Sequence, residues 1–386
     1  MRKDILFDLA YFRPDTTNQA LEMLFKASQE GGDDFIWSPH ESPLIRTLIE
    51  LFTTRGLMRL ESVKKAILKW DAQSKNDMPY KAPSAQPPVS MMNRWSTAEK
   101  QLVEIYLESL PASGWELSDH MMALELALQT YLPEEALVTE ATWLASKATM
   151  MGKVQQNWLK QQEPTPQEAN KLLEQMPGTL VEASYFPLSS KERLAMEFAV
   201  TRAVDNVVAL ADNTRKQMRQ IVAEDYMKRQ NGDTTGPSLQ SQLFDTFGEL
   251  NRDWRRIAIT EAGEAQLQGF IAGAKPGSKV KRIEQYADAC GFCKQIHGVI
   301  ATVVSPTKKD KNPDTEIWPG KNNVGRSAAP RKRVGGALIP RSKEEMYWLP
   351  AGLAHPHCRG RWVPVQVPDK AADPEFAAIL AEFLAD

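Results

Sequence analysis

One long run of helical periodicity, between Ser189 and Gly232, constrains the fold more than any other feature. Apolar side chains recur at helical spacing through it, at Leu194, Phe198, Val204, Val207, Val208, Ala211, Met218, Ile221, Val222 and Tyr226. Forty uninterrupted helical residues would extend about 60 Å at about 1.5 Å per residue. We expect a helix that ends at Asn231-Gly232, with a break near residues 211–213 as the alternative. A chain built on such a segment is predicted to be mainly α.

Other segments carry helix signals as well. Capping boxes at Ser38-Pro39-His40-Glu41 and at Ser96-Thr97-Ala98-Glu99 mark helix starts. The first capping box precedes two apolar runs at helical spacing, over residues 44–52 and 63–70. After Gly236-Pro237 a further helix is predicted over residues 239–272. His40 and His120 lie on predicted helices without a partner motif, and we expect both to be structural.

Proline-rich stretches and a change in local composition divide the chain into regions. From Val280 onward Gly and Pro become frequent, and β-branched runs appear at 299–304 and 362–365. We therefore predict an N-terminal helical region at 1–75, a Pro-rich linker at 76–95, a helical domain at 96–185, a domain at 186–366 whose last part is a module at 280–366, and a C-terminal helix at 367–386.

The three cysteines form the strongest site signal. Cys290-Gly-Phe-Cys293 is a C-x2-C knuckle that lets two thiolates reach one metal ion, and His355-Pro-His-Cys358 offers a second pair at the same spacing. Cys290, Cys293, His355 and Cys358 together make a Cys3His set, which is typical of structural zinc with no open position for reactive water. The ligands would close the 61-residue loop 294–354. The predicted fold is therefore mainly α, with long helices and a small α+β, zinc-stapled C-terminal module.

Other interpretations of these residues stay open. The three cysteines could be buried thiols with surface histidines, or Cys290 and Cys293 could be a redox pair. His357 or His297 could replace His355 as the fourth ligand.

A basic segment lies between the two ligand pairs. Residues 308–343 hold ten basic and three acidic residues, a net charge of +7, whereas the whole chain carries −2. Such a loop suits phosphate contacts, with Trp318, Tyr347 and Trp348 as stacking groups, although a run of charge is more often a solvated surface. The predicted nucleic-acid contacts are Lys308, Lys309, Lys311, Lys321, Arg326, Arg331, Lys332 and Arg333.

Several classes of function are disfavoured by what the sequence lacks. It has no Walker A, dinucleotide-binding or nucleophile-elbow motif, so we expect neither an enzyme nor a small-molecule substrate. No window approaches the ~18 uncharged apolar residues of a membrane span, and the start, with Asp4 and Asp8, is unlike a secretory signal. With a composition of 42% hydrophobic and 25% charged residues, we expect a globular protein made in a cytoplasm.

The ordered motifs resemble one family. Residues 256–262 (Arg-Ile-Ala-Ile-Thr-Glu-Ala) on a helix, then Cys290-x-x-Cys293 with Gly298, then His355-Pro-x-Cys358-Arg359 before a strand are similar to the phage Mu protein F-like minor head proteins, the phage head morphogenesis family. The resemblance covers about residues 190–365, so the domain at 186–366 would be the head morphogenesis domain. The family usually has Arg where Ile259 stands and a second Cys where Gly360 stands.

The resemblance implies a structural protein of the virion, inside the capsid near the portal vertex, after assembly in the host cytoplasm. Its partners would be the portal protein, with the major capsid or scaffolding protein and packaged double-stranded DNA as further candidates. Its roles would be head assembly and genome packaging or ejection. The alternative is a zinc-stapled HNH-like nuclease or a toxin-linked Mu F-like protein, which a magnesium-dependent nicking assay would separate from a binding protein.

Overall fold

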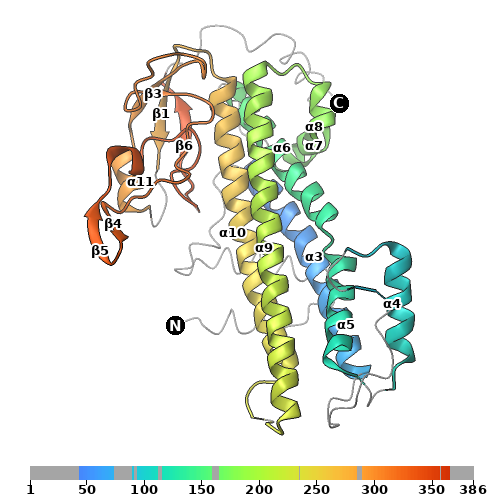
Figure 1. The fold of residues 1–386 in the computed structure, drawn as a ribbon. Helices are drawn as coiled ribbons and strands as arrows, with labels where there is room; N and C mark the ends of the chain where they lie inside the picture. The colour runs from blue at the N-terminus through green and yellow to red at the C-terminus, as the bar shows by residue number, and fades with distance from the viewer. Residues whose placement is uncertain are drawn as a thin grey trace. The chain divides into compact units, whose positions relative to one another are not determined.

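The computed structural model describes residues 43–73, 89–90, 94–111, 115–158, 165–233, 235–284, 289–356 and 358–365. The described elements are, in chain order (Figure 1), α3 Pro43–Gln73, α4 Thr97–Ser109, α5 Leu117–Tyr131, α6 Glu134–Trp158, α7 Pro166–Gln175, α8 Leu180–Ser184, α9 Ser190–Gln230, α10 Leu239–Gly273, β1 Lys279–Ile283, α11 Gly291–Ile296, β2 Ile300–Val303, β3 Glu316–Ile317, β4 Arg331–Val334, β5 Ala337–Pro340, the 3-10 helix Lys343–Glu345 and β6 Arg361–Pro364. The predicted fold class, mainly α with a small α+β module near the C-terminus, is confirmed. The capping box at 38–41, His357 and the closing helix at 367–386 lie outside the described residues, as does most of the linker at 76–95.

The long helices follow the apolar periodicity closely. α9 runs without a break through residues 211–213 and ends one residue before Asn231-Gly232, where Gly232 has a φ of 72°. α4 begins with the predicted capping box, in which the Glu99 N–H donates to Ser96 Oγ at 3.2 Å. α3 is one helix where two apolar runs were predicted. It continues through Gly56, whose missing Cβ leaves room for the Trp254 indole.

The described residues belong to two compact units. The first holds Thr53–Val138 and Asn206–Trp254, and the second holds the described parts of Ser28–Phe52, Thr139–Asp205 and Arg255–Asp386. This division differs from the consecutive regions predicted above. The reason is that α3, α6, α9 and α10 each give residues to both units.

The first unit buries a histidine among aromatic rings. His120 of α5 is 2% exposed, and its Nδ1 accepts a hydrogen bond of 3.1 Å from Trp70 Nε1. The rings of Trp115 and Tyr226 lie 5.4 and 6.0 Å from the imidazole. Burial, together with the charge of Arg229, lowers the pKa of His120 to about 4, so the imidazole is neutral at neutral pH.

Helix contacts in the second unit are close and partly ionic. α6 crosses α10 through two glycines: a Cβ on Gly152 would lie 2.6 Å from the Phe270 nitrogen, and one on Gly269 would lie 2.9 Å from the Thr149 carbonyl carbon. α9 and α10 lie side by side (Figure 1). They are joined by Arg202, which pairs with Glu261 at 3.1 Å and with Glu264 at 3.3 Å.

The C-terminal module, which we define as residues 274–365, is built on a four-stranded sheet of order β3-β2-β1-β6. β1 is antiparallel to both β2 and β6, and β2 is parallel to β3. β2 and β6 match the two predicted β-branched runs. A separate two-stranded sheet, β4-β5, forms a hairpin.

The module has its own apolar core, which includes the last turns of α10. Its members are Leu267, Phe270, Ile271, Ala274, Val280, Ala289, Cys293, Ile296, Ala301, Val303, Ile317, Leu349, Ala351, Leu353, Ala354, Cys358 and Trp362. Two of the predicted metal ligands, Cys293 and Cys358, are therefore core residues of the module.

Candidate metal centre

Two cysteines project from one turn at the start of α11. Cys290 is the N-cap of this helix, and its Sγ accepts the backbone N–H of Cys293 at 3.4 Å. Because an N-cap side chain folds back over the first turn, the spacing brings both sulfurs to the same side of the helix end. Cys290 is exposed and Cys293 is buried, so the pair spans the boundary between solvent and the module core.

His355 and Cys358 approach this turn from the segment that precedes β6. His355 Nε2 lies 3.2 Å from both Cys290 Sγ and Cys293 Sγ, and Cys358 Sγ lies 3.8 Å from Cys293 Sγ. A tetrahedral zinc ion with Zn–S near 2.3 Å sets S···S edges of about 3.8 Å and S···N edges of about 3.5 Å. The three separations that involve His355 Nε2 and Cys293 Sγ are thus close to tetrahedral edges, and Cys358 reaches the cluster through Cys293.

The donor atoms form two overlapping groups. Cys290, Cys293 and His355 lie within 4.8 Å of one another, and so do Glu284, Cys293 and Cys358. Cys293 belongs to both groups and is the central donor. The cluster can hold a metal ion.

The imidazole of His355 is oriented for coordination. Its Nδ1 lies 2.7 Å from the Pro356 carbonyl oxygen, to which a protonated Nδ1 donates. That hydrogen bond selects the tautomer in which Nε2 is the free acceptor facing the two sulfurs. Metal-bound histidines in proteins usually donate their second ring N–H in this way.

A buried ion pair lies beneath Cys358. The Arg282 side chain is 0% exposed, and it donates to Glu284 Oε1 at 2.6 Å, to the Gly352 carbonyl at 2.9 Å and to Cys358 Sγ at 3.6 Å. Its guanidinium also lies 5.4 Å from the centre of the Trp362 ring. Three thiolates and a neutral imidazole around a divalent ion would carry one net negative charge, and Arg282, whose own charge is paired with Glu284, donates a hydrogen bond to one of those sulfurs.

Sequence reasoning missed Arg282 and Glu284, although a signal was available. The side chains of a strand alternate, so Val280, Arg282 and Glu284 share one face, and Val280 is an apolar residue that the core buries. Gly360 carries a second signal, because a Cβ there would collide with the Glu284 carboxylate. A side chain at this position, where the resembled family usually has a second cysteine, would therefore require the Glu284 carboxylate to move.

The environment shifts the ligand pKa values in different directions. Burial raises the pKa of Cys290, but the Cys293 N–H and the neighbouring His355 outweigh burial and lower it overall. Burial, Cys293 and Glu284 raise the pKa of Cys358 well above its usual value. Burial lowers the pKa of His355, but the Pro356 carbonyl and the charges of Cys358 and Cys290 raise it overall. A metal ion binds thiolates, so its arrival displaces the proton that Cys358 otherwise retains.

Two buried polar residues of α10 anchor the loop between the ligand pairs. Glu264 Oε2 accepts the Leu353 N–H at 2.6 Å, and Gln268 Oε1 accepts the Gly320 N–H at 2.8 Å. A Cβ on Gly352 would collide with the Glu264 carboxylate, so the loop backbone lies directly on this side chain. Neither anchor was predicted, because each side chain meets a loop residue more than fifty positions away along the chain.

The other described histidine of the module is engaged elsewhere. His297 Nδ1 accepts the backbone N–H of Glu284 at 3.0 Å, and His297 is not a member of either donor group among the described residues. His355 is thus the histidine that the structure places at the cysteines. His357 lies outside the described residues.

Several of the predicted nucleic-acid contacts have partners within the module. Lys308 pairs with Glu316 and Lys332 pairs with Glu345. Lys311 Nζ lies 5.3 Å from the centre of the Trp318 ring.

Arg326 is also engaged within the module. It lies 3.7 Å from the centre of the Trp348 ring and donates to the Met346 carbonyl at 2.9 Å. The remaining predicted contacts, Lys309, Arg331 and Arg333, are exposed.

Lys321 corrects the sequence interpretation. Its side chain is 1% exposed, and Nζ donates to the Pro313 and Glu316 carbonyls at 2.6 and 2.8 Å. Trp318 and Trp348 cover it, with ring centres 4.8 and 5.1 Å from Nζ. Burial lowers its pKa to about 7, against the opposing charge of Asp314. Lys321 therefore holds two loop carbonyls together from a buried position and cannot contact a phosphate. The rings of Trp318 and Trp348 shield its ammonium group from solvent.

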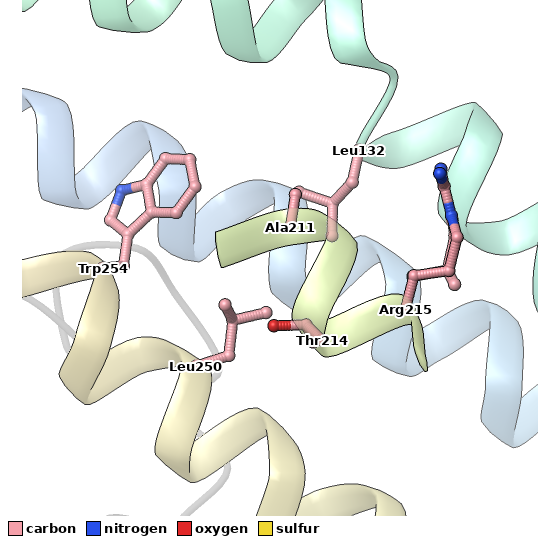
Figure 2. Close-up of a pocket in the computed structure, with 7 residues that line it drawn as sticks. Leu132, Ala211, Thr214, Arg215, Leu250 and Trp254 are labelled. Atoms are coloured by element: carbon pink, nitrogen blue, oxygen red, sulfur yellow. The ribbon is translucent and has the colours of Figure 1, made fainter. Parts of the chain in front are cut away.

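A small pocket in the first unit offers no comparable chemistry. It is lined by Leu128, Leu132, Ala211, Thr214, Arg215, Leu250 and Trp254. Figure 2 shows Leu250 and Thr214 pointing toward one another while the Arg215 side chain extends away. Arg215 Nε lies 3.6 Å from the buried Glu125 carboxylate. The volume of about 20 Å³ suits about one water molecule.

Among the described helices, none is both long enough and apolar enough to cross a membrane. Comparison of the chain with protein-family models, with curated proteins and with solved structures gives no match.

Proposed function

We propose that the chain is a non-enzymatic structural protein whose C-terminal module is stapled by one zinc ion. The cluster of Cys290, Cys293, His355 and Cys358 carries this proposal, because it gathers three cysteine sulfurs and an imidazole nitrogen around Cys293, whose Sγ lies 3.2 Å from His355 Nε2 and 3.8 Å from Cys358 Sγ. Such soft donors favour zinc over magnesium or calcium, which prefer oxygen ligands. Four protein ligands leave no coordination position for a reactive water, which favours a structural role.

A metal ion at this site would constrain the loop between the two ligand pairs. Residues 294–354 contain short strands and turns, and much of their surface is exposed. A metal ion that joins α11 to the segment before β6 fixes both ends of this loop. Binding free energy at such a site is at the same time folding free energy.

The zinc content of the purified chain tests this proposal directly. Elemental analysis of the wild type should find one zinc per chain, and Cys358→Ser should lose it together with protection of residues 290–360 from hydrogen exchange. Thr315→Ser is a matched control, since it changes an exposed side chain in the same loop and should keep the metal. A folded wild type without zinc would refute the staple and favour a thiol or redox role for Cys290 and Cys293.

We further propose that the protein is a minor head protein of a tailed bacteriophage, inside the capsid near the portal vertex. The ordered motifs at residues 256–262, 290–293 and 355–359 support this proposal by their resemblance to the phage Mu protein F-like family. The portal protein would be its main partner. The major capsid or scaffolding protein and packaged double-stranded DNA would be further partners during head assembly, genome packaging or ejection.

A reconstitution experiment tests the assignment to the phage head. The full chain and the portal protein encoded in the same genome are purified separately, mixed and passed over a size-exclusion column. The proposal expects the chain to elute with the portal ring. Separate elution at micromolar concentrations would count against this partner.

A nicking assay tests the competing nuclease interpretation. An HNH-type site needs a histidine as general base beside a catalytic magnesium ion, whereas His297 is held by the Glu284 N–H. Supercoiled plasmid incubated with the chain and magnesium should therefore stay intact. Nicking that EDTA suppresses and that purifies with the chain would overturn the non-enzymatic proposal.

A further inference from the structure

The β4–β5 hairpin is a two-stranded ribbon exposed to solvent. Its strands pair in register over four residues each, and Gly335 and Gly336 make the turn with φ values of 55° and 88°. Positive φ at both central residues is the geometry of a type I′ hairpin turn. Every residue of the two strands except Lys332 is exposed. A hairpin that buries so little has a surface available for a partner.

The register separates the side chains into two faces. Arg331 lies opposite Pro340 and Arg333 lies opposite Leu338, so these four residues share one face. On the other face, Lys332 is only partly exposed and pairs with Glu345. The first face therefore presents two arginines side by side with apolar neighbours.

Several basic residues of the module are engaged in ion pairs, whereas Arg331 and Arg333 are among its exposed charges. Lys308, Lys332 and Lys343 pair with acidic residues. Among the described residues, neither Arg331 nor Arg333 takes part in an ion pair, and both are exposed. The hairpin and the residue after it, 331–341, contain four basic residues and no acidic residue. Charge complementarity calls for a polyanionic partner.

We propose that this hairpin binds double-stranded DNA through its Arg331–Arg333 face, entering the major groove as a two-stranded ribbon. The major groove is wide enough for such a ribbon. Alternate residues on a strand are about 6.8 Å apart, which equals about two base-pair rises of B-DNA. Leu338, 60% exposed on the same face, suits apolar contact with thymine methyl groups.

This inference deepens the proposed contact with packaged DNA, and it rests on that part of the proposed function. The inference narrows the predicted DNA contact from the whole basic segment 308–343 to one face of the β4–β5 hairpin. Lys321, Arg326 and Lys332 take no part in it, because the module itself engages their side chains.

Fluorescence anisotropy with a short labelled duplex of mixed sequence tests the proposal on the full chain. The comparison is between the wild type, Arg331→Gln/Arg333→Gln, and Lys275→Gln/Lys279→Gln. The control pair removes the same charge from exposed positions of the same module outside the hairpin. Losing two phosphate contacts should weaken binding at least tenfold and reduce the slope of log K against log salt by about 2 between about 50 and 200 mM salt.

The outcomes discriminate clearly. A wild type that does not bind the duplex overturns the proposal, and so does equal weakening by the control pair, which would indicate net charge alone. Tighter binding to the single strand than to the duplex overturns the groove geometry. Selective loss in the hairpin variant, at an unchanged melting temperature, supports it.

Zinc measured in the same samples keeps this test separate from that of the staple. A zinc-loaded chain without DNA binding refutes the hairpin proposal and the proposed DNA contact on which it rests, and leaves the staple intact. A zinc-free chain that binds DNA through the two arginines refutes only the staple.

Discussion

Replacing Gly152 by alanine tests how tightly α6 and α10 pack in the second unit. Alanine is the better helix former by about 1 kcal/mol, so the substitution should stabilise an open helix. At Gly152, however, the new Cβ would lie 2.6 Å from the Phe270 nitrogen and 2.9 Å from the Gln266 carbonyl carbon. Carbon contacts need about 3.5 Å or more, and the Gln266 carbonyl oxygen would lie closer still to the new Cβ, so the helices must separate by about 1 Å or more.

The expected change in the free energy of unfolding follows from these opposing effects. Overpacking a close interface costs about 1–3 kcal/mol, and the upper part of that range applies because the opposing atoms are backbone that no rotamer change can move. After subtracting the gain in helix propensity, Gly152→Ala should destabilise the second unit by about 2 kcal/mol. Gly269→Ala acts at the same crossing, with its Cβ 2.9 Å from the Thr149 carbonyl carbon. The double variant should therefore cost less than the sum of the two.

Gly248 supplies the matched control. It also lies within α10, but no atom lies within 4 Å of the position where its Cβ would stand. Gly248→Ala should stabilise the chain by about 0.5–1 kcal/mol. Urea unfolding followed by circular dichroism measures all four variants. If Gly152→Ala were as stabilising as Gly248→Ala, the close approach of α6 and α10 would be refuted.

Three further predictions concern the metal centre and the buried charges. Removing the metal with a chelator should expose the loop 294–354 to limited proteolysis, and adding zinc back should restore resistance; cleavage that ignores the metal would contradict the staple. Arg282→Met should destabilise the chain by about 3–5 kcal/mol because it leaves the buried Glu284 carboxylate unpaired. Adding Glu284→Gln should recover much of that loss in thermal melts, whereas equal instability of the double variant would argue against the ion pair. The pKa of His120 is lowered from 6.5 to about 4, so its stabilising effect is present above pH 6.5 and is lost as pH falls toward 4. That loss amounts to about 3 kcal/mol, and His120→Gln should flatten this part of the stability curve measured by urea titration.

Sequence alone determined the features that depend on near neighbours along the chain. The apolar repeat predicted α9 and α10 to within a residue or two, and the Ser96–Glu99 capping box marked the start of α4. The spacing of Cys290 and Cys293 indicated a shared turn, which the structure forms as the N-cap of α11. The sequence shows these features because apolar helix periodicity, capping boxes and the C-x2-C spacing each relate residues no more than four positions apart.

Tertiary structure decided which charges are buried, paired or available. Arg282 meets Cys358 across 76 positions of sequence, and nothing local in either segment specifies that contact. Lys321 reads as one more lysine in a basic run, yet two carbonyls and two indoles enclose it. The same run leaves Arg331 and Arg333 exposed because side chains alternate along β4, so both lie on the opposite face from Lys332, which pairs with Glu345. Burial and ion pairing depend on chain segments brought together only by folding, so local patterns cannot specify them.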